Sequence, residues 1–137
     1  RYKEALFNFP NVHFLSAVPA EELPAYLEGS DILLVPYREA FQQQMANPHK
    51  MMEYLGTGRP VVATYTACYS YQDERVIRMA PRNSEFTELL VDTVEHLDEY
   101  QDESLVRERK AVVEASSYEE RIRQIEGILV GVEGKKA

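Results

Sequence analysis

The stretch from Asn47 to Thr64, NPHKMMEYLGTGRPVVAT, constrains the fold most, because it combines a helix start, a helix end and a buried strand. Pro48 suits the first helical position, since its fixed φ fits there and its missing N–H is not needed. Asn47 is then the natural N-cap. Gly56 and Gly58 give the helix a place to end. The unit predicts a helix whose first backbone N–H groups face the end of a neighbouring strand, an arrangement that favours anion binding.

Segments with strand and helix patterns alternate along the chain. Strands are expected at Asn11–Leu15, Ile32–Val35, Val61–Thr64 and Arg75–Met79. Further helices are expected at Ala20–Glu28, from Asn83 or Ser84 to Leu97, and as two pieces of Leu105–Val130 broken near Ser116 and Ser117. Residues 98–104 are expected to be an acidic linker, and residues 131–137 a frayed tail. The alternation predicts an α/β fold with a Rossmann-like parallel sheet and flanking helices.

Apolar positions indicate which faces these elements bury. The continuous run Ile32–Val35 is typical of a strand that is covered on both faces. The expected apolar stripes are Phe86, Leu89, Leu90 and Val94 on one helix, and Ile122, Ile125, Ile128 and Leu129 on the last helix. Both stripes are expected to face the core. Ligands of parallel sheets bind beyond the carboxyl ends of the strands, which places residues 16–19, 37–47 and 64–71 at one rim.

The composition fits one globular domain without a basic surface. The chain has 137 residues, 45% of them hydrophobic, which is enough for a hydrophobic core without disulfides or a structural metal. Its formal net charge of −8 argues against nucleic-acid binding. Cys68 is the single cysteine, so no internal disulfide can form, and a cytoplasmic location fits. No apolar run has transmembrane length, and the chain starts at Arg1 without an initiator Met, which predicts a fragment or an excised domain.

Lys50 and Glu53 are three residues apart and share one flank of the expected helix with Asn47. Lys50 lies in the first turn, where the helix macrodipole disfavours a cation by roughly 0.3–1 kcal/mol, and a bound phosphate would remove that conflict. Glu53 lies further along and can accept two hydroxyl hydrogen bonds, which suits a ribose diol. The alternative is a surface ion pair between Lys50 and Glu53, and the spacing alone favours that alternative.

Other residues of interest are expected at the same rim. Arg38 could clamp phosphate oxygens in a bidentate manner, or could be a solvated loop arginine. Three tyrosines could stack on a sugar or a base, or simply cover the end of the sheet: Tyr65, Tyr69 and Tyr71. His49 could donate to a phosphate, but an exposed histidine on the helix surface is the favoured interpretation. No two histidines have metal-ligand spacing, so no metal site is predicted.

Two long segments carry a distinctive pattern. The first, residues 11–38, is NVHFLSAVPAEELPAYLEGSDILLVPYR, and the second is NPHKMMEYLGTGRPVVAT. Together they resemble the C-terminal half of glycosyltransferases of the GT-B fold, group 1 or family 4-like, in which NP-x-K-x-x-EY-L-x-x-G-x-PVVAT is common. The closing EASSYEERIRQIEGIL also resembles the last helix of that family. The resemblance covers nearly the whole chain and implies the truncated C-terminal, donor-binding half of such an enzyme.

The resemblance also implies a substrate and a site. The donor would be a UDP- or GDP-linked sugar, whose hexosyl group passes to a glycan or lipid-linked acceptor in bacterial polysaccharide biosynthesis, without a metal or other cofactor. The implied nucleotide-sugar site consists of Val18, Arg38, Asn47, His49, Lys50 and Glu53. Lys50 and the amides near His49 would contact the diphosphate, Glu53 the ribose and Val18 the base. The acceptor would bind a missing N-terminal domain, and the complete protein could be peripheral to the inner membrane.

The sequence departs from the family pattern at two positions. Met45 stands where many relatives carry a first glutamate near the transferred sugar, and Ser16 replaces the usual glycine after the first strand. No catalytic residue is assigned, because a catalytic base often lies in the acceptor domain, and the chain alone is expected to be inactive. The alternative to a transferase is a non-catalytic Rossmann-like module that binds a ligand or a partner protein.

Overall fold

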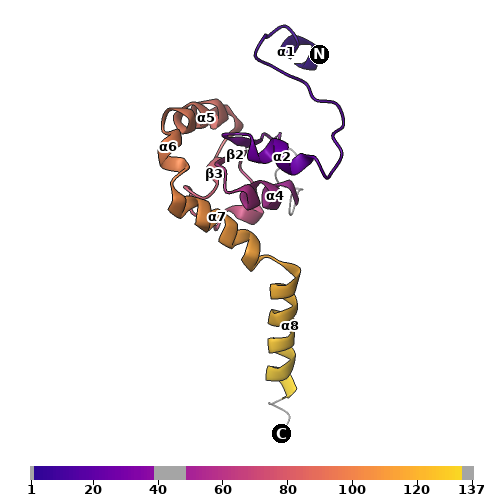
Figure 1. Cartoon of the computed structure of the whole chain (residues 1–137). Coiled ribbons are helices and arrows are strands. Elements are labelled where there is room, and N and C mark those ends of the chain that lie inside the picture. Colours follow the sequence, from indigo (N-terminus) through magenta and orange to yellow (C-terminus); the bar gives the residue numbers. More distant parts are fainter. Residues whose placement is uncertain (1, 39–48, 134–137) are drawn as a thin grey trace.

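The computed structural model describes residues 2–38 and 49–133 of the chain. Within them, three short parallel strands form one sheet in the order β1-β2-β3: β1 is Leu33–Val35, β2 is Val61–Thr64 and β3 is Arg78–Ala80. In the register of the sheet, Leu33 lies beside Val61, and Val62 lies beside Arg78. Helices flank this sheet (Figure 1), so the predicted Rossmann-like α/β class is confirmed.

The core lies between β2 and helix α4 (His49–Thr57), the helix predicted from the Asn47 unit. Alternate residues of a strand point to opposite faces. Val61 and Ala63 therefore share one face, where they pack with Met51 and Leu55 of α4, and all four side chains are buried. The opposite face of β2 and β3 is contacted by helix α5 (Phe86–Glu95). The predicted helix start at Asn47 and Pro48 lies outside the described residues.

α4 ends at Gly58 rather than at Gly56, which lies inside the helix. Gly58 has a φ of +80°, a conformation that costs an L side chain roughly 1–2 kcal/mol, and its N–H donates to the Leu55 carbonyl at 2.9 Å. A Cβ atom at Gly58 would also lie 2.7 Å from Cγ1 of Val106 on helix α7 (Glu103–Ala115). Gly58 thus ends the helix and allows α7 to approach its end closely.

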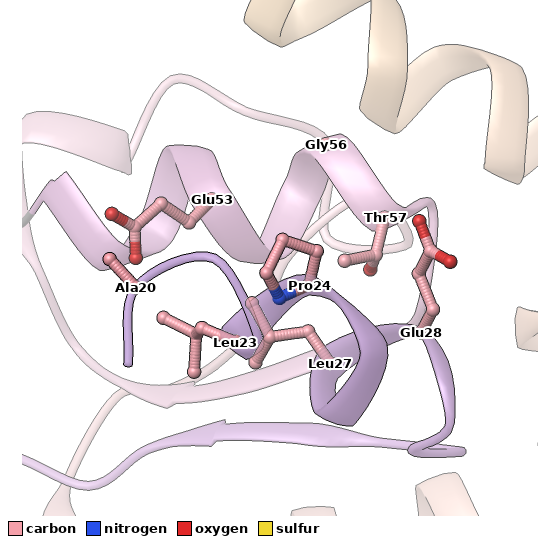
Figure 2. Close-up of a pocket in the computed structure, with 8 residues that line it drawn as sticks. All are labelled: Ala20, Leu23, Pro24, Leu27, Glu28, Glu53, Gly56 and Thr57. Atoms are coloured by element: carbon pink, nitrogen blue, oxygen red, sulfur yellow. The ribbon is translucent and has the colours of Figure 1, made fainter. Parts of the chain in front are cut away.

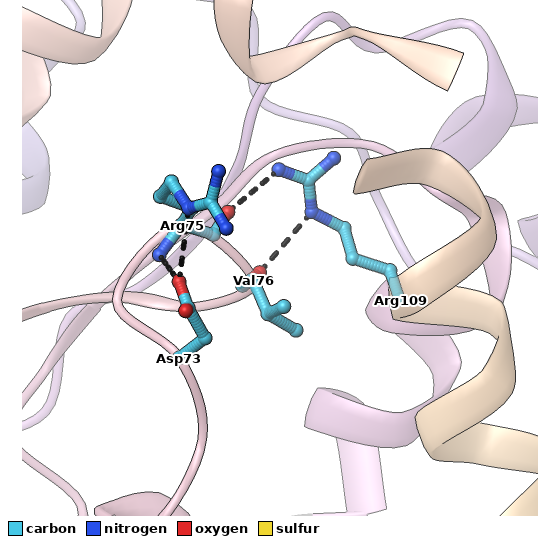
Figure 3. Close-up of polar contacts among 4 residues, drawn as sticks. All are labelled: Asp73, Arg75, Val76 and Arg109. Atoms are coloured by element: carbon cyan, nitrogen blue, oxygen red, sulfur yellow. Dashed lines mark hydrogen bonds and ion pairs between the residues drawn. The ribbon is translucent and has the colours of Figure 1, made fainter. Parts of the chain in front are cut away.

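Helix α7 is attached to the rest of the fold through Arg109, whose side chain is fully buried. Its guanidinium donates to four backbone carbonyls, those of Gly58 (3.0 Å), Arg75 (3.0 Å), Val76 (3.1 Å) and Tyr100 (2.7 Å). Figure 3 shows Arg109 reaching from α7 to the segment before β3. Burial lowers the pKa of Arg109 to about 10, so the guanidinium is protonated at neutral pH. One side chain therefore joins the end of α4, α7, the segment before β3 and helix α6 (Leu97–Tyr100).

β3 begins three residues later than predicted, and β1 is less covered than predicted. Before β3, Asp73 Oδ1 accepts from the backbone N–H of Arg75 at 2.8 Å, and the Asp73 carbonyl accepts from Val76. This turn, also drawn in Figure 3, uses the N–H groups that a strand would need for pairing. On β1, Leu34 is 39% exposed, so the prediction of a strand covered on both faces is wrong, because α5 packs on β2 and β3.

The N-terminal part of the chain departs most from the sequence prediction. Helix α1 (Tyr2–Leu6) and the trace that follows it lie away from the sheet (Figure 1). Residues 11–15 form no strand, and Leu15 is 61% exposed. A strand needs a neighbour that accepts its backbone hydrogen bonds, and none of the described strands lies beside this segment. Helix α2 (Leu23–Glu28) begins three residues after the predicted start.

The C-terminal half is helical, with boundaries that partly match the prediction. The 3₁₀ turns are η1 (Ala67–Tyr69) and η2 (Asn83–Glu85), and the last helix is α8 (Tyr118–Glu133). The predicted break near Ser116 and Ser117 is confirmed. The predicted acidic linker is wrong, because it contains most of α6 and the start of α7, and the tail predicted at 131–137 is helical to Glu133.

The two predicted apolar stripes are not buried as expected. On α5, Phe86, Leu89 and Leu90 are half-buried, but Val94 is exposed. On α8, Ile122 and Ile125 are exposed, because the helix extends away from the sheet (Figure 1). An apolar stripe indicates that a face can be buried, but it does not say which element covers it.

Candidate functional site

The exposed flank of α4 carries the two charged residues on which the predicted site depends. Lys50 and Glu53 are exposed, as is His49 in the first turn, whereas Met51 and Leu55 point into the core. The predicted flank shared by Lys50 and Glu53 is therefore confirmed, and the opposite side of the helix is apolar. Among the ion pairs between described residues, none joins Lys50 to Glu53. The simple alternative of a surface ion pair between them is not formed.

Lys50 is instead directed at Tyr37, the second residue after β1. Its Nζ lies 5.3 Å from the centroid of the Tyr37 ring, within the range of a cation–π interaction. This contact places the first turn of α4 beside the carboxyl end of β1, on the rim where ligands of parallel sheets bind. Arg38 follows Tyr37 and is exposed at the same rim. Asn47, the predicted N-cap, lies outside the described residues.

Glu53 lies one turn further along α4 and faces a cavity of about 380 Å³ between α2 and α4. The cavity is lined by Ala20, Leu23, Pro24, Leu27, Glu28, Glu53, Gly56 and Thr57. Figure 2 shows the Glu53 carboxylate near Ala20 at one end and Glu28 near Thr57 at the other. An apolar wall with a carboxylate at each end can hold a flat, partly apolar group and accept hydrogen bonds from its hydroxyl groups.

Val18 is half-buried in the segment that leads to α2, two residues before Ala20. It is not among the residues that line the cavity. The structure thus brings Lys50 and Arg38 to the rim through their proximity to Tyr37, and it brings Glu53 to the cavity. It leaves Val18 beyond the cavity wall.

A hydrogen-bond network at the rim joins the carboxyl ends of all three strands. The N–H of Tyr37 donates to Oγ1 of Thr64 at the end of β2, at 2.9 Å, and that hydroxyl lies 3.4 Å from the Val35 carbonyl. The side chain of Asn83, which follows β3, donates to the Tyr37 carbonyl at 2.9 Å. The helix predicted to start at Asn83 or Ser84 starts at Phe86, because Asn83–Glu85 form the turn η2, and the cap residue of α5, Glu85, makes no side-chain cap hydrogen bond.

Thr64 was expected at the rim, but the hydrogen bonds by which Thr64 and Asn83 hold Tyr37 were not predicted. The usable signal was their position, because each is a polar side chain at or just after the end of a strand. The three rim tyrosines differ in exposure. Tyr69 is buried in the core, while Tyr65 and Tyr71 are 41% and 73% exposed.

The cysteine and the two remaining histidines show no sign of a reactive site in the structure. Cys68 is half-buried, and burial raises the pKa of its thiol, which disfavours a reactive thiolate. His13 is exposed in an irregular segment, not placed in a strand as predicted. His96 lies 2.9 Å from the Asp92 carbonyl through Nδ1, and this hydrogen bond, with the nearby Asp92 carboxylate, raises its pKa. The described residues contain no group of three His, Cys, Asp or Glu arranged to hold a metal ion.

The parallel sheet, its flanking helices and the rim at the strand ends define a Rossmann-like α/β protein. Over residues 1–99, the sequence matches the family described as Glycosyl transferases group 1. The chain belongs to this glycosyltransferase family, which confirms the resemblance found in the sequence.

A curated relative agrees with this assignment. The chain is 36% identical over 61 residues to the putative teichuronic acid biosynthesis glycosyltransferase TuaH of Bacillus subtilis (strain 168). The aligned region is 44% of this chain but 15% of the relative, so the chain spans a small part of that protein's length. No solved structure gives a significant match. Within the described part of the chain, every helix is too short or too polar to cross a membrane.

Proposed function

We propose that this chain forms the donor-binding domain of a glycosyltransferase that moves a hexosyl group from a nucleoside-diphosphate sugar to a glycan or lipid-linked acceptor. Family membership supports the transfer reaction, and the name of the Bacillus relative supports a role in bacterial polysaccharide biosynthesis. The observation that carries the proposal is the exposed flank of α4, where Lys50 is directed at the sheet rim and Glu53 faces an apolar cavity.

In this proposal, the two charged residues bind different parts of the donor. Lys50 and the backbone N–H groups at the start of α4, near His49, contact the diphosphate, with Arg38 as a second cation and Asn47 at the cap. Glu53 accepts hydrogen bonds from the ribose, and the apolar wall between α2 and α4 covers the nucleoside near Val18. A diphosphate gains negative charge as it leaves the sugar, so a cation and a helix N-terminus that already face it stabilise the transition state. We propose that no metal is needed, and that the complete protein acts in the cytoplasm or at the inner membrane.

The test is titration of UDP and GDP into the full-length protein by calorimetry. Lys50→Ala and Glu53→Ala should each weaken binding by about 10-fold or more, because each removes a charge-assisted hydrogen bond to the ligand. Lys110→Ala and Glu126→Ala remove the same charges from exposed positions on α7 and α8, and they should bind as the wild type does. A chelator should leave the affinity unchanged.

Equal affinity of the wild type and both α4 variants would refute the site. Weakening by the Lys110 or Glu126 controls to the same extent would show an effect of net charge alone.

A further inference from the structure

Tyr37 carries structural features that the proposed function does not use. Its backbone is fixed on both sides, since its N–H donates to Thr64 Oγ1 at 2.9 Å and to the Val35 carbonyl at 3.2 Å, and its carbonyl accepts from Asn83. Thr64 is buried, so this attachment is shielded from water. Tyr37 itself is half-buried and packs against the core cluster. Its ring is therefore held in a defined position at the carboxyl ends of the strands.

Lys50 occupies a position that is unfavourable for a cation on its own helix. It lies in the first turn of α4, where the macrodipole repels positive charge. The Tyr37 ring offers a compensating attraction at 5.3 Å from Nζ, through the negative face of its π-system. The ring also restricts a long side chain that would otherwise sample many rotamers, and such restriction lowers the entropy lost when a ligand binds.

We propose that Tyr37 is a positioning residue for Lys50, and that its ring holds the ammonium at the mouth of the donor site before the diphosphate arrives. The inference rests on the proposed function, because it assumes that Lys50 contacts the diphosphate. The ring covers one side of the ammonium, and the remaining N–H groups stay available to phosphate oxygens. Tyr37 contributes to affinity through Lys50, without a hydrogen bond of its own to the donor.

The first experiment compares Tyr37→Leu with Tyr37→Phe in the full-length protein. Both substitutions keep the backbone hydrogen bonds, but only phenylalanine keeps the aromatic ring. Tyr37→Leu should weaken UDP or GDP binding by about 2- to 5-fold, and Tyr37→Phe by less than about 2-fold. Uridine and guanosine, which lack phosphate, should bind both variants as they bind the wild type. A general structural defect would weaken nucleoside and nucleotide alike, and that result would overturn the proposal.

A double-mutant cycle tests whether the effect passes through Lys50. In a Lys50→Met background, Tyr37→Leu should cause no further loss of nucleotide affinity. A further loss as large as in the wild-type background would refute the positioning role. If Lys50→Met weakens binding but Tyr37→Leu does not, the donor site stands and the role of Tyr37 is wrong. If Lys50→Met binds UDP and GDP as the wild type does, the diphosphate assignment and this inference both fail.

A ligand-free measurement examines the contact directly. With lysines labelled by ¹³C, the Lys50 ε-methylene protons should show an upfield ring-current shift that is lost in Tyr37→Leu and kept in Tyr37→Phe. Lys110 on α7 serves as an internal control, whose signal should not change. An unshifted Lys50 signal in the wild type would overturn the inference even if nucleotide binding is confirmed.

Discussion

Arg109 offers the sharpest test of how this domain is held together, through the substitution Arg109→Met. Methionine keeps an apolar stem of similar length but removes every donor. Four backbone carbonyls then lose their partner, and each buried carbonyl left without a hydrogen bond costs at least about 1 kcal/mol. Relief from burying a charge offsets part of the loss. We therefore expect the free energy of unfolding to fall by about 3–5 kcal/mol, a large share of the stability of a typical domain.

The matched control lies on the same helix. The side chain of Arg107 is 72% exposed, and its partner among the described residues is Glu103, at 3.4 Å. Arg107→Met should change the free energy of unfolding by less than about 0.5 kcal/mol, because exposed ion pairs contribute little. Arg109→Lys keeps the charge but not the planar fork, so it should lie between Arg109→Met and the wild type.

The assay is thermal and urea unfolding followed by circular dichroism, with all variants measured in the same buffer. Arg109→Met should lower Tm by roughly 10–20 °C. A Tm within a few degrees of the wild type, or equal effects of the Arg107 and Arg109 substitutions, would refute the reasoning. Either result would mean that water satisfies the four carbonyls or that they are not clustered around this side chain.

Two further predictions concern the end of α4 and one surface histidine. Gly58→Ala should lower the free energy of unfolding by about 1–3 kcal/mol, because the new side chain would have a positive φ and would contact Val106 too closely. Gly56→Ala, which has open space around its Cβ, should raise the free energy of unfolding by up to about 1 kcal/mol. Urea unfolding curves of the two variants that shift in the same direction would contradict this. The raised pKa of His96 means that its contact with Asp92 stabilises the fold fully below pH 6.5 and loses that effect as pH rises through the folded-state pKa. His96→Asn should therefore lower Tm more at about pH 5.5 than at about pH 8.5, and a constant difference would argue against the contact.

α4 and β2 could be predicted because their signals are local. Helical spacing alone places Met51 and Leu55 on one side of the helix and Lys50 and Glu53 on the other. Gly58 and the nearby Pro60 end the helix within the same segment. The predicted strand Asn11–Leu15 has equally good local composition, but a strand forms only beside a partner, and composition says nothing about that partner.

The candidate site shows the same division between local and distant information. The sequence indicated Lys50 and Glu53 by their spacing, but it did not indicate that Tyr37 would receive the ammonium. That contact depends on where the end of β1 lies relative to the start of α4. Arg109 shows this even more clearly. Within the helix sequence ESLVRERKAVVEA, nothing distinguishes Arg109 from Arg107, and the carbonyls that bind Arg109 come from distant segments.

These contacts together fix α4 at both of its described ends. Near the C-terminal end, Gly58 allows α7 to approach, and Arg109 holds the Gly58 carbonyl. Near the N-terminal end, the Tyr37 ring faces Lys50 and is itself anchored to the strand ends through Thr64. A helix held in this way keeps its exposed flank in one position relative to the sheet rim before a ligand is present. Because a preorganised site loses less entropy on binding, we expect contacts at Gly58 and Tyr37 to affect affinity at the proposed donor site on this flank.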